Sequence, residues 1–444
     1  MLAAIYFPVI AGLAGARAVP EELRSIVSAD LQGALTRMAR RMHVSGMVPT
    51  QDAQAWQLYA DLLLTCGKSE EAESAYQFVQ RCVRGSRVGV RILSCRNAAW
   101  QAIFRHRFGL ALMSFSRVIE DEEASCVARL EARVGASLAL YCAGQVDEAV
   151  GLCDALSQAL RTMQIEDHAL WSELVAMIAE DMRIQRRVRT LLGLHEHLHT
   201  SAAKYALPEA SSVADHARVL NAVSCEFLKH RANYLVALQR LACGERDGLA
   251  GLHKHLEWTV RMGLASYPRL VRTECAMAAL ATHLEGVAEQ FIAPLETLVC
   301  GRASAPRSGG ERDQIELLYC FAKIRQLQDK SKEALRYYTA YASLAIEILR
   351  SDNRAVFAFL GRIERGGILP VDDVSLRLPP KYRRAYRYMV ENLHRARLSV
   401  GEVAAEAGVT ERALQAAFKA HLGLSPGELL RRVREEQRRE IEYI

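Results

Sequence analysis

Three long polar side chains stand at helical spacing near the C-terminal end of the chain. Arg412 is followed by Gln415 three residues later and by Lys419 four residues after that. Residues three and four apart lie on one face of an α-helix. In the major groove of DNA, Arg pairs bidentately with guanine and Gln with adenine, whereas Lys419 is better placed for phosphate. The pattern therefore predicts a helix whose base-reading residues are Glu411, Arg412, Gln415 and Ala416.

The elements that would position this face have clear boundaries in the sequence. Ser399, followed by Glu402, forms a capping box that begins one helix. Gly408 can take the left-handed conformation that ends it, and Thr410 caps a second helix over 410–422. The helices share an apolar seam of Val403, Ala404, Val409, Leu414 and Phe418. Such a helix-turn-helix presents its second helix to the major groove; the alternative is an ordinary helical hairpin with a solvated face.

Basic residues surround this helix pair. A preceding helix carries Arg383, Arg384 and Arg387 between apolar residues, so one face packs and the others stay basic. We expect DNA phosphate contacts from these arginines and from Ser399, Thr410 and Lys419. Between residues 377 and 434, twelve Lys and Arg stand against five Glu, whereas the whole chain has a formal charge of +6. The positive excess therefore lies in this region, as a DNA footprint requires.

The segment from Leu398 to Arg434 resembles the AraC/XylS family of bacterial transcription activators. Its text reads LSVGEVAAEAGVTERALQAAFKAHLGLSPGELLRRVR. The resemblance implies a sequence-specific activator whose partners are double-stranded DNA and RNA polymerase. A tetratricopeptide-like region ahead of such a unit is similar to the activators of type III secretion genes in plant-associated and pathogenic proteobacteria.

The sequence departs from the family pattern in two ways. The family usually has a second helix-turn-helix after a linker helix, but here the chain ends at Ile444. A large basic residue is also common in the family where Ala416 stands. We therefore expect the unit at 381–444 to be incomplete, either as a truncated product or as one that needs a partner copy to span two groove segments.

The chain ahead of this region contains repeated helical hairpins. Trp56 and Ala72 fit the tetratricopeptide template, in which a large residue fills the gap left by a small one where two helices cross closely. Ala111 and Ala149 mark weaker copies, at intervals of 39 and 38 residues. Further degenerate copies centre on Ala237, Ala288 and Ala334. We expect an irregular tetratricopeptide-like α-solenoid over 1–360; a non-repeating helical bundle is the alternative.

The composition indicates the fold class, and two segments interrupt the helical pattern. Helix formers dominate and alternating runs of β-branched residues are almost absent, so the expected fold class is all-α. Residues 301–310 are rich in loop formers and are predicted to form an exposed loop. Residues 361–380 lack helical periodicity over much of their length, and we expect them to link the solenoid to the C-terminal unit.

No pattern in the sequence indicates chemistry on a substrate. We find no phosphate-binding Gly loop, metal-ligand cluster or nucleophile elbow, so we expect no enzyme, no catalytic or metal site and no cofactor. The eleven cysteines stand without a C-x-x-C pair, which is typical of reduced thiols in a reducing compartment. The apolar N-terminus has no basic region ahead of it and is too short to span a bilayer, so we expect a cytoplasmic protein without a membrane contact.

Two functions fit these observations. The first is a DNA-binding transcription activator whose solenoid receives a protein or small-molecule signal, or mediates self-association as a homodimer. The second is a tetratricopeptide adaptor or chaperone-like protein whose incomplete C-terminal unit does not bind DNA productively. Retention on DNA at low salt distinguishes the two.

Overall fold

The protein is helical throughout the part that can be described. The computed structural model describes residues 2–15, 19–44, 53–83, 86–190, 194, 218–297, 314–346, 378–391 and 398–442. Within these ranges every regular element is a helix and there is no strand. The all-α prediction is therefore confirmed.

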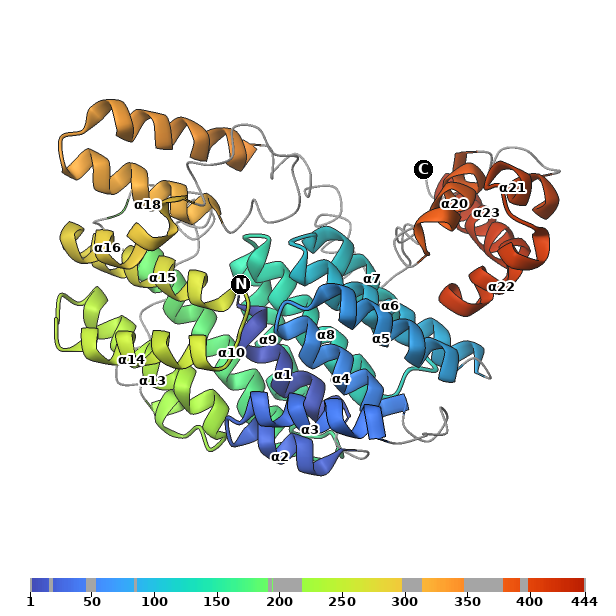
Figure 1. Cartoon of the computed structure of the whole chain (residues 1–444), viewed down its shortest axis with the longest axis horizontal. Helices are drawn as coiled ribbons and strands as arrows, with labels where there is room; N and C mark the ends of the chain where they lie inside the picture. Colours follow the sequence, from blue (N-terminus) through green and yellow to red (C-terminus); the bar gives the residue numbers. More distant parts are fainter. Residues whose placement is uncertain are drawn as a thin grey trace.

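The larger part of the chain is an array of helices that pack on their neighbours. Its first half comprises α1 Ala3–Ala14, α2 Pro20–Val27, α3 Leu31–Val44, α4 Ala53–Thr65, α5 Ser69–Cys82, α6 Arg87–Phe104, α7 Phe108–Glu120, α8 Cys126–Cys142, α9 Val146–Leu160 and α10 His168–Arg189. Its second half comprises α13 Glu226–Ala242, α14 Gly248–Arg261, α15 Tyr267–Ala281, α16 Glu285–Ile292, α18 Gln314–Leu327 and a helix over 331–346. Most helices pack against the next one along the chain, as in α4 with α5, α7 with α8 and α15 with α16 (Figure 1). This neighbour-to-neighbour packing is the arrangement of an α-solenoid.

Small residues let these helices approach one another. Ala72, Ala111 and Ala149, which mark the first repeats in the sequence, have no exposed surface. The ring of Trp56 on α4 lies 4.5 Å from the ring of Phe78 on α5, measured between centroids. The repeat pattern therefore located small residues of the core, in helices of unequal length.

The apolar N-terminal helix lies inside the array. Every residue from Ala3 to Leu13 is buried, and α1 contacts α4, α8 and α10. The Tyr6 hydroxyl donates a hydrogen bond of 2.6 Å to Asp181 on α10. Packing on other helices explains why this segment is apolar. Among the described residues, no helix has the length and apolar character needed to cross a bilayer.

A buried arginine joins a helix of the first half to two helices of the second half. Arg231 on α13 has no exposed surface and forms two hydrogen bonds to Asp181 on α10, at 2.7 and 2.8 Å. It also forms two to Glu274 on α15, at 2.8 and 3.1 Å. Buried ions are tolerated when their charges are paired and their hydrogen bonds are made. Arg231 therefore serves as a structural tie.

The C-terminal helices form a second unit with its own core. We use the name C-terminal unit for Leu378 and Pro379 together with α20 Pro380–Glu391, α21 Val400–Glu406, α22 Glu411–Leu422 and α23 Pro426–Glu442. Its buried apolar residues form a cluster separate from that of the solenoid. Of the predicted linker over 361–380, residues 361–377 lie outside the described residues, as does the whole predicted loop over 301–310.

Candidate nucleic-acid interface

The helix pair α21–α22 begins and ends where the sequence predicted. The Ser399 hydroxyl accepts a hydrogen bond of 3.1 Å from the Glu402 amide at the start of α21. Gly408 has a φ of +64°, a conformation that favours glycine, and lies in the turn between the helices. The Thr410 hydroxyl accepts a hydrogen bond of 3.2 Å from the Ala413 amide at the start of α22. Both predicted caps are confirmed.

An apolar seam holds the two helices together. Val403, Ala404, Leu414 and Phe418 are buried in the cluster of the C-terminal unit, and Val409 packs against it. All five predicted seam residues therefore lie in or against this core. Because α22 buries this side, its other side is left to face solvent.

The predicted reading face is exposed and unpaired. The side chains of Arg412, Gln415, Ala416 and Lys419 are exposed. Arg412, Gln415 and Lys419 make no hydrogen bond or ion pair with any described residue. Their donors are therefore available to another molecule.

Glu411 differs from the other predicted base-reading residues. It is exposed at the start of α22, but its carboxylate lies against Gly401 in the first turn of α21. A carboxylate near a helix N-terminus is stabilised by the helix dipole. The structure thus gives Glu411 a contact within the helix pair, and a side chain at position 401 would collide with it.

The arginines of α20 do not form one surface. Arg384 is exposed and donates two hydrogen bonds to Glu406 of α21, at 3.1 and 2.9 Å. Arg383 is half-buried, and its Nε donates to the Leu378 carbonyl at 3.0 Å. Arg387 belongs to α20, but its side chain is outside the described residues. Of the predicted phosphate contacts on this helix, Arg384 is the one that the structure shows on the open surface.

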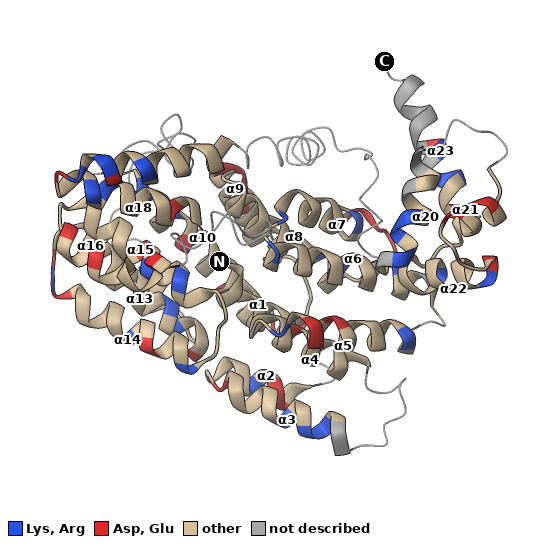
Figure 2. Ribbon diagram, turned by 45° about the horizontal axis from the view of Figure 1, so that its top comes forward, with Lys and Arg blue, Asp and Glu red and all other residues tan. Residues whose placement is uncertain are grey.

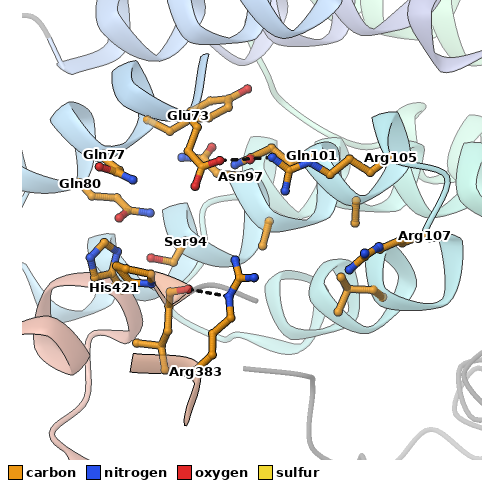
Figure 3. Close-up of a pocket in the computed structure, with 16 residues that line it drawn as sticks. Glu73, Gln77, Gln80, Ser94, Asn97, Gln101, Arg105, Arg107, Arg383 and His421 are labelled. Atoms are coloured by element: carbon orange, nitrogen blue, oxygen red, sulfur yellow. Dashed lines mark hydrogen bonds and ion pairs between the residues drawn. The ribbon is translucent and has the colours of Figure 1, made fainter. Parts of the chain in front are cut away.

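The C-terminal unit touches the solenoid through the end of α22. α22 packs against α5 and α6, so its last turn faces the solenoid while its first turns stay open (Figure 2). His421 and Arg383 line a pocket there together with Gln80 and Ser94 of the solenoid (Figure 3). No pattern in the sequence predicted this contact, because it joins segments more than 300 residues apart.

The described residues hold no group of His, Cys, Asp and Glu side chains that could bind a metal ion. Two cysteines of the helical core keep their protons at neutral pH. Burial raises the pKa of Cys153 and of Cys225 to about 11. Because the thiolate is the reactive form, these two cysteines act as small apolar residues of the helical core.

Comparison with known proteins extends over nearly the whole chain. It is 32% identical over 447 residues to "Regulatory protein HrpB" from Ralstonia nicotianae (strain ATCC BAA-1114 / GMI1000), covering 98% of this chain and 90% of that protein. The chain belongs to the HrpB family of regulatory proteins. No family model matches the chain. Because the match to HrpB includes both the solenoid and the C-terminal unit, the two parts belong together in this family, and the protein has a regulatory role.

Proposed function

We propose that this member of the HrpB family is a sequence-specific DNA-binding transcription activator of the AraC type, which reads the major groove with α22. The observation that carries the proposal is the exposed, unpaired set of Arg412, Gln415 and Lys419 on one helix. The caps and the apolar seam hold this helix in a defined orientation. A regulatory protein with such a helix would control genes by binding their DNA directly.

Contacts with the DNA backbone would come from the surroundings of this face. Ser399 and Thr410 stand exposed at the starts of α21 and α22, where helix N-termini favour phosphate. Arg384 and Lys419 add exposed positive charge. These groups position the helix on the duplex, whereas Arg412 and Gln415 select the sequence.

The solenoid would receive the signal. An extended array of helices offers a large surface for a protein or small molecule, or for a second copy of the chain. RNA polymerase is the partner expected of an activator, and we expect the protein to act in the cytoplasm, where bacterial DNA lies. The similarity to activators of type III secretion genes makes such genes the first targets to examine.

The proposal is tested by DNA selection with the full chain. Duplexes are enriched from a random library, and binding to the winner and to a scrambled duplex is measured by fluorescence anisotropy at several salt concentrations. Replacing Arg412 and Gln415 with Ala should lower the preference for the selected duplex, because each bidentate contact supplies about 1–3 kcal/mol of discrimination. Arg261→Ala, at an exposed position in the last turn of α14, is the matched control.

A second function is favoured by one observation. The last turn of α22 already packs against α5 and α6, so part of the helix serves as a protein contact. An adaptor or chaperone-like protein would use the C-terminal unit in this way and would not need DNA. Abundant protein partners in a pull-down, together with no DNA retention at low salt, would favour the adaptor over the activator.

A further inference from the structure

The last described helix of the solenoid exposes large apolar side chains. We use the name terminal helix for residues 331–346, which lie beside α18 at the edge of the array (orange in Figure 1). Leu335 is 67% exposed, Tyr338 is 47% exposed and Ile346 is 50% exposed. These are three of the six large apolar side chains that are exposed among the described residues. Open apolar surface is therefore concentrated on this one helix.

The exposed side chains form one stripe along the terminal helix. At 3.6 residues per turn, Leu335, Tyr338 and Ile346 lie within about 80° of the helix circumference. Half-buried Ala342 lies on the same stripe, between Tyr338 and Ile346. The opposite side packs on α18 through Tyr337, whose ring stacks on a phenylalanine of that helix at 5.2 Å between centroids. Because the outer face of a terminal repeat is normally polar, the apolar stripe indicates a contact with another molecule.

The stripe is complementary to itself when two copies pack antiparallel. About a two-fold axis, residue i of one copy meets residue j of the other, and j meets i. With the axis midway along the stripe, Leu335 meets Ile346 of the second copy at both ends. Nearer the axis, the ring of Tyr338 comes to lie beside the small Ala342 of the second copy. A large residue beside a small one lets two helices approach closely.

The charges on the terminal helix also favour an antiparallel pair. Lys332 and Arg336 are exposed and belong to its N-terminal half. At 1.5 Å per residue, antiparallel packing places the two copies of Lys332 about 25 Å apart along the helix axis and those of Arg336 about 13 Å apart. Both separations exceed the Debye length of about 8 Å at physiological salt. The basic half then lies beside the C-terminal half of the second helix, where the helix dipole is negative.

We propose that the terminal helix pairs antiparallel with the terminal helix of a second copy of this chain. A stripe of three large side chains gives a small interface, so the dimer is weak and depends on protein concentration. The pairing does not depend on DNA binding, and its test contains no DNA. One consequence does rest on the proposed function: a dimer would carry two copies of α22, as helix-turn-helix dimers do on paired half-sites.

The first test is sedimentation equilibrium of the full chain at several concentrations. We expect a reversible equilibrium between monomer and dimer. Leu335→Glu should weaken dimerisation by about tenfold or more, because its carboxylate would lose water against Ile346 of the second copy. Val260→Glu is the matched control, since it adds the same charge at a 63% exposed apolar position of α14. It should leave dimerisation unchanged.

The second test determines the orientation of the two helices by mixing variants, one of them carrying a fluorescent label. Chains with Leu335→Glu and chains with Ile346→Lys should associate with each other more strongly than either does with itself, because antiparallel packing brings the unlike charges together. A mixture of Leu335→Glu and Leu335→Lys contains the same charges. Each of them would face an unaltered Ile346, so this mixture should show no such gain.

Three outcomes would overturn the proposal. They are a chain that stays monomeric at every concentration, equal weakening by Leu335→Glu and Val260→Glu, and stronger association of the Leu335→Glu and Leu335→Lys mixture than of the mixture with Ile346→Lys. Circular dichroism establishes that each variant is folded. If Leu335→Glu does not fold, Tyr338→Ser on the same stripe should weaken dimerisation in its place. A dimer that binds no DNA would reject the proposed function and leave the pairing intact.

Discussion

Arginine serves opposite purposes in the two parts of this molecule. In the solenoid, Arg231 is fully buried and both of its carboxylate partners, Asp181 and Glu274, are on other helices. In the C-terminal unit, Arg412 is exposed and has no partner among the described residues. The hydrogen-bond donors of Arg231 are used within the fold, whereas those of Arg412 are available to another molecule. Burial, more than residue type, separates structural charge from binding charge.

Two other arginines of the solenoid are also buried and paired with carboxylates. Arg96 is paired with Asp61 at 2.7 Å and with Glu131 at 2.7 Å, all three nearly or fully buried. Arg189 donates two hydrogen bonds to Glu316, at 2.5 and 2.7 Å. These pairs join helices that are far apart in the sequence, so the solenoid core is held by charge as well as by apolar packing.

The largest effect is expected from breaking the buried tie. Arg231→Met leaves Asp181 and Glu274 buried without their partner, and removing one member of a buried pair costs about 3–5 kcal/mol. Arg412→Met, at an exposed position, should change the free energy of unfolding by less than about 0.5 kcal/mol. Urea denaturation of both variants measures the difference. An equal loss in the free energy of unfolding for both variants would show that burial does not separate the two arginines.

The next largest effect on the free energy of unfolding is expected from close packing within the solenoid. A methyl group at Gly135 of α8 would overlap the ring of Phe115 on α7, so Gly135→Ala should destabilise the protein by about 1–3 kcal/mol. Gly151 of α9 has open space around the corresponding position. Gly151→Ala should therefore stabilise by roughly 0.5–1 kcal/mol, because alanine is the better helix former. Thermal unfolding of the pair should give shifts of opposite sign.

A buried histidine makes the stability of the solenoid depend on pH. Burial lowers the pKa of His255 well below its usual value, and Arg231 nearby adds to the effect. The unfolded chain takes up a proton near pH 6.5 that the folded chain does not, so the free energy of unfolding falls as the pH drops below about 6.5. The slope for one such proton is up to about 1.4 kcal/mol per pH unit.

The variant His255→Gln should reduce this slope and retain a group that can hydrogen-bond with Tyr267, the present partner of the ring at 2.9 Å. His253→Gln, at an exposed position of the same helix, is the control. Denaturation at pH 5 and pH 7 measures both. An unchanged slope in His255→Gln would assign the pH dependence to another group.

A smaller effect is expected at the start of α22. Thr410→Ala removes the side-chain cap of the Ala413 amide and should cost about 1 kcal/mol. Thr410→Ser, which keeps the hydroxyl, should lose only a fraction of this. Hydrogen exchange of the α22 amides reports the loss locally. Exchange within the solenoid should stay the same, because the C-terminal unit has its own core.

Only a small effect on stability is expected at Arg384. Its ion pair with Glu406 is exposed, with 72% of the Arg384 side chain accessible, and such pairs contribute about 0–1 kcal/mol. Arg384→Gln should nevertheless reduce the slope of log affinity for DNA against log salt by about one, as expected for a phosphate contact. An unchanged slope would remove Arg384 from the predicted interface.

Local patterns predicted much of the C-terminal unit. The caps at Ser399 and Thr410, the turn at Gly408 and the seam containing Leu414 and Phe418 all depend on residues within a few positions of one another. The same holds for the small residues of the solenoid repeats, such as Ala72. Contacts between distant segments were not predicted. Arg383, expected at DNA phosphate, lines a pocket most of whose other residues are in α5 and α6.

By itself, the sequence determined where the helices of the C-terminal unit begin and which side of α22 is apolar, because caps and periodicity act through neighbours in the chain. It also determined the positive charge of that unit. Only the tertiary structure decided which arginines are neutralised, as Arg231 is and Arg412 is not. It alone brought Gln80, Ser94 and Arg383 to one pocket. The reason is physical: burial and pairing depend on what packs across a residue, and no local pattern records that.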